Sequence, residues 1–103
     1  MPNERIKEID LVVPSLRLAE TNGGFIATAN LIIELEGIFQ PSGQDSEIIH
    51  GRSDTYFSQK VRNLISHRHG ENSFIHNGYA DYDEEQHGIR ITDSGVKLLR
   101  KLG

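Results

Sequence analysis

Five residues with hydrogen-bonding side chains recur between positions 55 and 66: Thr55, Gln59, Arg62, Asn63 and Ser66. At about 100° per residue, this spacing places all five within one sector of a helix. Groups of this kind read base edges in the major groove of double-stranded DNA, with Arg favouring guanine and Asn or Gln favouring adenine. No acidic residue lies between positions 55 and 68, although a solvated helix face in so acidic a chain would be expected to carry Glu. The pattern therefore predicts base reading in double-stranded DNA, and the solvated face of an ordinary core helix is the alternative.

Six further residues flank this face with groups that can bind phosphate: Arg52, Ser53, Lys60, His67, Arg68 and His69. Contacts of this kind fix the position of a protein on DNA without reading its sequence. The chain has a net charge of −4, but residues 50–78 contain four Lys or Arg and two acidic residues. This middle part of the chain is therefore expected to approach the phosphates. The polar stretch 40–53, to which Arg52 and Ser53 belong, is equally compatible with a plain surface loop.

Titratable residues elsewhere form no recognisable catalytic or metal-binding pattern. His67 and His69 are close in sequence, but a structural zinc site needs four ligands and the chain has no Cys. The carboxylates of residues 81–85 could hold Mg²⁺ for phosphodiester cleavage, yet no known motif places a general base beside them. A phosphate-cradling glycine loop and a Ser or Cys nucleophile motif are also absent from the sequence. The sequence predicts a protein that is not an enzyme and uses no cofactor or metal.

The helix that must position these side chains is predicted over residues 54–67. Ser53 or Asp54 can cap its start with a side-chain oxygen. Its apolar residues follow the i, i+4, i+7, i+8 spacing of an inward face: Phe57, Val61, Leu64 and Ile65. The polar face is thereby directed away from the core.

Before this helix, the pattern predicts a helix, a short strand and a second helix. The first helix is expected to be interrupted or restarted at Pro14, because proline lacks a backbone donor. The Asn-Gly-Gly stretch at residues 22–24 predicts the end of that helix, and residues 25–27 suit a strand. Thr28 can then cap the second helix, which ends before a Pro-Ser-Gly stretch. The apolar face of the second helix is expected to contain Leu31, Ile32, Leu35 and Phe39.

After the helix predicted over residues 54–67, the pattern predicts a hairpin and a last helix. Residues 74–83 and 89–91 are expected to form two strands joined by a polar tip at residues 83–88. Thr92 can cap a last helix over residues 93–102. The apolar residues of this helix are expected to return to the core: Val96, Leu98, Leu99 and Leu102. The order helix, strand, helix, helix, strand, strand, helix defines an α+β fold.

The chain of 103 residues is expected to form a single domain, residues 1–103, with one hydrophobic core. It has no Cys, so disulfides cannot stabilise it, and a reducing setting is expected. The first ten residues are charged rather than apolar, and no apolar run approaches the roughly 18 residues of a membrane span. A cytoplasmic protein without membrane contact is predicted.

The predicted order of elements, with a strand before the second helix and a hairpin after the third, resembles a winged helix-turn-helix. Residues 88–95, Gly-Ile-Arg-Ile-Thr-Asp-Ser-Gly, are similar to the pattern of aliphatic residue, Thr, two residues and Gly that closes the wing in such domains. Residues 57–64, His67-Arg68 and residues 78–80 resemble winged-helix modules attached to bacterial and archaeal restriction endonucleases, including modification-dependent ones. Two features depart from the pattern: the connection between the second and third helices is long, and the wing tip is acidic.

The resemblance implies a three-helix core with a C-terminal helix, a short strand and a β-hairpin wing. It further implies a DNA-specificity module, the targeting part of a restriction endonuclease in a restriction-modification system, with a fused or associated nuclease domain as partner. Reading of a methylated base is a further implication, with N6-methyladenine favoured over methylcytosine. A winged-helix module that binds proteins through the acidic wing or the first helix, and a small transcriptional regulator, are the alternatives.

Overall fold

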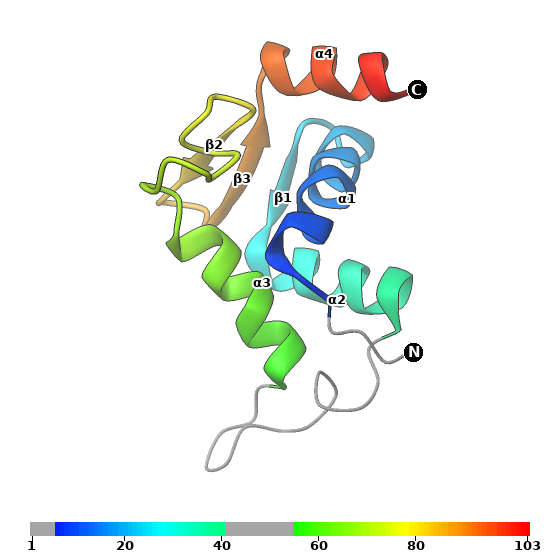
Figure 1. Ribbon diagram of the computed structural model, residues 1–103, viewed down its shortest axis with the longest axis vertical. Helices are drawn as coiled ribbons and strands as arrows, with labels where there is room; N and C mark the ends of the chain where they lie inside the picture. The colour runs from blue at the N-terminus through cyan, green and yellow to red at the C-terminus, as the bar shows by residue number, and fades with distance from the viewer. Residues whose placement is uncertain (1–5, 41–54) are drawn as a thin grey trace.

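The computed structural model describes residues 6–40 and 55–103. Within these ranges the chain forms four helices and a three-stranded antiparallel sheet (Figure 1). Their order is α1 (Glu8–Thr21), β1 (Phe25–Ala27), α2 (Thr28–Phe39), α3 (Tyr56–Ser66), β2 (Ala80–Asp83), β3 (Gly88–Ile91) and α4 (Asp93–Leu102). The predicted α+β class and the predicted order of elements are confirmed. Among the described residues, no helix is long and apolar enough to cross a membrane.

The first helix, α1, runs without interruption through Pro14, so the prediction of a break there is wrong. Pro14 removes one backbone hydrogen bond, but Asp10, whose carbonyl oxygen would have accepted it, is exposed to water. Leu11 and Leu16 lie on either side of Pro14 and are fully buried, so core packing keeps the helix continuous. The predicted end of the helix at residues 22–24 is confirmed.

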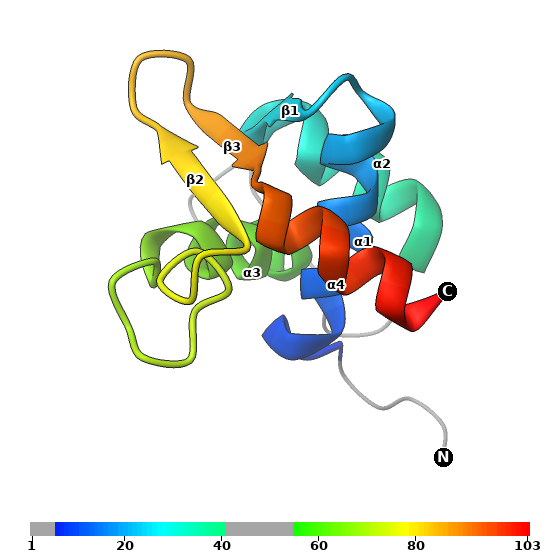
Figure 2. The same cartoon turned by 90° about the horizontal axis from the view of Figure 1, so that it is seen from above.

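The sheet has the order β1-β3-β2, so the second strand of the hairpin is the central strand (Figure 2). Ile89 of β3 pairs with Ile26 of β1 on one side and with Tyr82 of β2 on the other, both in antiparallel register. Gly88 permits this close approach, because a Cβ atom there would collide with the Ile26 carbonyl oxygen and the Phe25 ring. The sheet thereby joins the first third of the chain to the last.

The strand predicted over residues 74–83 is shorter than expected, because β2 covers only its last four residues. The preceding residues form turns instead. The Ser73 hydroxyl accepts a hydrogen bond from the Ile75 N–H at 3.1 Å, and the Tyr79 N–H donates to the Phe74 carbonyl oxygen at 3.0 Å. Phe74 is nevertheless buried in the core, so its apolar character reflects burial and not a strand.

The hydrophobic core is formed by residues of all four helices, of the sheet and of the turns before β2. The predicted inward faces of α2 and α3 are confirmed by the burial of Leu31, Ile32, Leu35, Phe57, Val61, Leu64 and Ile65. The half-buried Phe39 packs against Phe57, with 6.2 Å between ring centroids, and so joins α2 to α3. In α4, Leu99 is buried, but Leu102 is 55% exposed because it lies at the last residue of the helix. The prediction that Leu102 returns to the core is wrong.

The starts of α4 and α2 are held in different ways. Thr92 caps α4 as predicted, since its side-chain oxygen accepts a hydrogen bond from the Gly95 N–H at 3.1 Å. Thr28, in contrast, is the first helical residue of α2; Ala27 occupies the N-cap position, and no side chain caps the helix. The Thr28 N–H donates to the His87 carbonyl oxygen at 2.8 Å. The start of α2 is therefore tied to the hairpin and not to a capping side chain.

Candidate nucleic-acid interface

The helix predicted over residues 54–67 is shorter at both ends than expected. Its cap is Thr55, and Ser53 and Asp54, the two expected caps, lie outside the described residues. The Thr55 Oγ1 accepts a hydrogen bond from the Ser58 N–H at 3.0 Å, and the Ser58 Oγ accepts one from the Thr55 N–H at 2.9 Å. The Thr55 hydroxyl, predicted to read a base, is therefore engaged in starting the helix.

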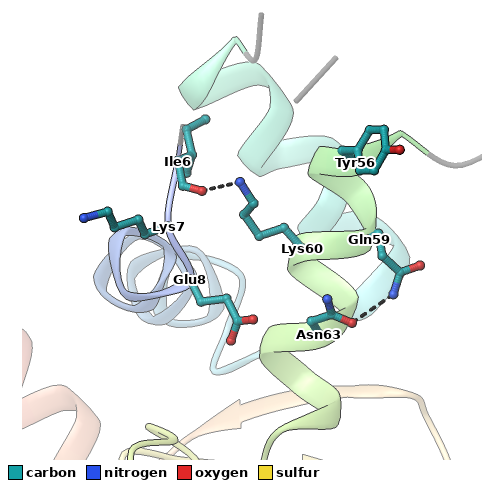
Figure 3. A pocket seen from close by; sticks show the side chains of 7 residues that line it. All are labelled: Ile6, Lys7, Glu8, Tyr56, Gln59, Lys60 and Asn63. Carbon is teal, nitrogen blue, oxygen red and sulfur yellow. Dashed lines mark hydrogen bonds between the residues drawn. The ribbon is translucent and has the colours of Figure 1, made fainter. Parts of the chain in front are cut away.

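The other four predicted base-reading residues share the face of α3 that is directed away from the core. Gln59 Nε2 donates a hydrogen bond to Asn63 Oδ1 at 2.9 Å, so the two amides form a pair one turn apart (Figure 3). The Ser66 hydroxyl donates to the Asn63 carbonyl oxygen at 3.3 Å in the next turn. Arg62 is exposed on the flank of α3 that faces the hairpin. This face thus presents amide, guanidinium and hydroxyl groups along two turns.

A hollow of about 650 Å³ lies beside the amide pair, between α3 and the start of α1 (Figure 3). Ile6 and Tyr56 are among the residues that line it. Lys60 Nζ donates a hydrogen bond to the Ile6 carbonyl oxygen across this hollow. Lys60, predicted to bind phosphate, is therefore directed toward the start of α1 and joins α3 to the residues just before that helix.

The three basic residues after α3 have different surroundings. His67 Nδ1 lies 3.1 Å from Glu8 Oε1 of α1. The Arg68 guanidinium stacks on the Tyr82 ring of β2, 4.3 Å from the ring centroid, whereas His69 is exposed. Of these three residues, Arg68 is the one that connects the end of α3 to the hairpin. The remaining two predicted phosphate ligands lie outside the described residues: Arg52 and Ser53.

The hairpin ends in a turn that Asp83 organises. Asp83 Oδ1 accepts hydrogen bonds from the N–H groups of Gln86 and Glu85, each at 3.0 Å, and Asp83 Oδ2 lies 3.2 Å from Arg90 Nη2. The Gln86 N–H first, and then the Arg90 guanidinium, hold the pKa of Asp83 below that of an ordinary aspartate. The acidic tip is therefore built around one carboxylate with a structural role. Within the described parts of the chain, no three His, Cys, Asp or Glu residues gather where a metal ion could bind.

The turn at the hairpin tip is expected to loosen on acidification, at a pH below the ordinary pKa of an aspartate. Because the folded pKa of Asp83 is lowered, its stabilising effect is fully present above the ordinary value of 3.8 and is lost as the pH falls through the lower folded value. The amide signals of Glu85 and Gln86, followed by NMR between about pH 6 and pH 2, measure this change. In the Asp83→Asn control this transition should be absent, and a midpoint at or above 3.8 in the native protein would contradict the expectation.

The chain matches no protein-family model, no curated protein and no solved structure. The assignment of a function therefore rests on the residues and contacts of this surface. Three residues beside the outward face of α3 were not predicted from the sequence as part of the site: Ile6, Glu8 and Tyr82. Each of them contacts a residue of α3, or one just after it, that is distant along the chain, and no sequence pattern indicates such a contact.

Proposed function

We propose that this domain is a winged helix-turn-helix that binds double-stranded DNA with α3 in the major groove. The observation that carries the proposal is the outward face of α3, where the half-buried Gln59–Asn63 amide pair lies beside the exposed residues Arg62 and Ser66. Amide and guanidinium groups match the donor and acceptor patterns of adenine and guanine edges. No acidic residue interrupts this stretch between positions 55 and 68, so nothing on it repels phosphates.

The elements around α3 support the same proposal. Helix α2 packs on α3 through Phe39 and Phe57, as the first helix of a helix-turn-helix packs on the second. Strands β2 and β3 form an antiparallel hairpin that would serve as the wing, and Arg68 on Tyr82 places a cation between α3 and this wing. The exposed carboxylates at the wing tip are expected to stay away from the DNA backbone, because like charges repel.

The target that we propose is a site of a restriction-modification system, read on behalf of a fused or associated nuclease in the cytoplasm. The Gln59–Asn63 pair favours adenine, since the Asn63 amide has a donor and an acceptor that match its N7 and N6–H groups, whereas the Gln59 Oε1 atom is buried. N6-methyladenine keeps one N6–H, and Ile6 and Tyr56 give the adjacent hollow apolar walls that would contact a methyl group. The domain would supply recognition and no catalytic group.

Binding to a pool of short duplexes tests this proposal. The pool contains unmodified DNA and DNA with N6-methyladenine or methylcytosine, at about 50 mM salt, where phosphate contacts are strong. One motif is expected to be enriched, with higher affinity for its N6-methyladenine form. Uniform absence of binding at this salt concentration would contradict the proposal and favour a protein-interaction module that uses Glu84 and Glu85, which are exposed at the wing tip.

A further inference from the structure

A second hollow, of about 360 Å³, lies between the first two turns of α1 and the turns that follow α3. Four of the residues that line it are apolar: Ile9, Val12, Leu64 and Phe74. Ile9 is 70% exposed, whereas Leu64 and Phe74 belong to the hydrophobic core. The core thus reaches the surface at this hollow, which offers an apolar contact to a side chain from outside the domain.

The end of α4 presents another apolar side chain to solvent. Leu98 and Leu102 lie one turn apart on α4, on the side of the helix opposite to Arg100. Arg100 Nη2 lies 2.6 Å from Glu20 Oε2, near the end of α1. The two leucines are therefore directed toward the start of α1. Leu98 is half-buried, and Leu102 is 55% exposed.

Helix α1 connects the hollow to the end of α4. Ile9, Val13 and Glu20 lie along one flank of α1, at about 100° per residue. Helix α4 packs against the second half of this flank and leaves its first half uncovered. The start of α1 thus lies between the end of α4 and the turns that follow α3 (Figure 2). We call this surface the α1–α4 patch, and it consists of the hollow together with Val13, Leu98 and Leu102.

The charges around the α1–α4 patch are separated by sign. Glu8 and Glu71 line the hollow, and none of its described lining residues is Lys or Arg. Lys97 and Lys101 are exposed on α4, and neither forms an ion pair within the part of the chain that the structure describes. A surface with an acidic half and a basic half is complementary to itself, because a two-fold axis places each half against the other.

We infer that a second copy of this chain docks on the α1–α4 patch with two-fold symmetry. Leu102 of each copy enters the hollow of the other beside Ile9, and Lys101 of each copy approaches Glu71 of the other. Each contact occurs twice and the pairing closes on itself, so the assembly stops at two copies. This inference does not rest on the proposed function. The four residues on the outward face of α3 do not line the hollow: Gln59, Arg62, Asn63 and Ser66.

Two substitutions and a matched control in the complete chain test this pairing. Ile9→Glu adds a carboxylate to the first turn of α1, and Leu102→Lys adds a cation at the end of α4. Helix ends favour charges of these signs, so neither change is expected to destabilise the fold. Ile33→Glu, the control, replaces an apolar residue of α2 that is 63% exposed and does not belong to the patch.

Sedimentation velocity over a range of protein concentrations measures the dissociation constant of the dimer. The native chain is expected to dimerise with a roughly micromolar constant, as small interfaces do. Ile9→Glu and Leu102→Lys are each expected to raise this constant at least about tenfold, while Ile33→Glu leaves it unchanged. The melting temperatures of the three variants should match that of the native chain.

Charge reversal distinguishes this arrangement from other dimers. Lys101→Glu and Glu71→Lys are each expected to weaken the dimer, and the double variant should regain most of the native affinity because the reversed charges attract again. A dimer that survives both Ile9→Glu and Leu102→Lys, or that the double reversal does not restore, would overturn the inference.

The oligomeric state of the native chain gives the remaining outcomes. A chain that stays monomeric up to about 1 mM would overturn the inference and leave the patch to a different protein. An assembly larger than two copies would overturn the two-fold arrangement. Because the measurement contains no DNA, a chain that dimerises as described but binds no duplex would contradict the proposed function alone.

Discussion

Truncation of Phe57 to Ala is expected to lower the free energy of unfolding by about 3–5 kcal/mol. The Phe57 ring is fully buried and packs against Phe39, with 6.2 Å between ring centroids. Its removal leaves a cavity between α2 and α3 that the surrounding side chains fill only in part. The free energy of unfolding of a small domain is roughly 5–15 kcal/mol, so this loss is a large fraction of it.

Tyr56→Ala is the matched control for this prediction, since Tyr56 is the neighbouring residue of α3 and is 37% exposed. It is expected to cost less than about 1 kcal/mol, as substitutions away from the core do. Urea unfolding followed by circular dichroism gives both values. Equal losses for the two variants would show that packing of the Phe57 ring does not hold α3 on α2.

Replacement of Gln59 or Asn63 by Ala is expected to relax the preference for one base pair by about 1–3 kcal/mol. The two amides are hydrogen-bonded at 2.9 Å, so each truncation also removes the group that orients the other. The double variant is therefore expected to lose less than the sum of the single losses. Affinities for the preferred duplex and for a duplex with that base pair exchanged, at one salt concentration, provide the measurement.

Arg68→Gln provides the contrast to these amide variants. A lost phosphate contact weakens binding to both duplexes equally, because phosphates carry no base identity. The ratio of the two affinities should therefore stay at the wild-type value. If Gln59→Ala and Asn63→Ala also kept that ratio, α3 would not be the base-reading helix.

The inward and outward faces of α3 could be predicted from the sequence because a single apolar stripe meets a single core. The four apolar residues of that stripe are all buried, and the residues predicted to read bases are half-buried or exposed, although the polar residue Ser58 is buried as well. The start of the helix was harder to predict, since three consecutive residues before it have side chains that can cap. The reciprocal hydrogen bonds between Thr55 and Ser58 select the actual cap.

Predictions failed where tertiary packing overrides local preference. Pro14 disfavours a continuous helix locally, but burial of Leu11 and Leu16 on both sides keeps α1 intact. Phe74 has the side chain of a strand residue, yet hydrogen bonds around Ser73 fold this segment into turns. The sequence signal at Pro14 concerned the backbone and the signal at Phe74 concerned burial, but in both places the backbone geometry depended on packing and hydrogen bonds that the local sequence does not show.

The surroundings of the candidate site could not be predicted, because they depend on residues far apart along the chain. No spacing rule pairs Lys60 with the Ile6 carbonyl oxygen or Arg68 with the Tyr82 ring. The amphipathic pattern identifies the exposed face of α3, and folding decides which of its flanking cations remain available for a ligand. Lys60 is directed toward α1, whereas the Arg68 guanidinium lies over the Tyr82 ring and donates a hydrogen bond to the Ile65 carbonyl oxygen at 3.3 Å.

The hairpin is part of the sheet that holds the whole domain together, since β3 is the central strand and the His87 carbonyl oxygen is bonded to α2. Its conformational entropy is therefore lost during folding, and little remains to be lost when a ligand binds. A hairpin fixed in this way cannot adjust to its partner. A duplex that must bend or widen to fit it would bear the deformation energy, which depends on its sequence. The stiffness of the sheet would thus make the domain selective for DNA shape, even at base pairs that no side chain contacts.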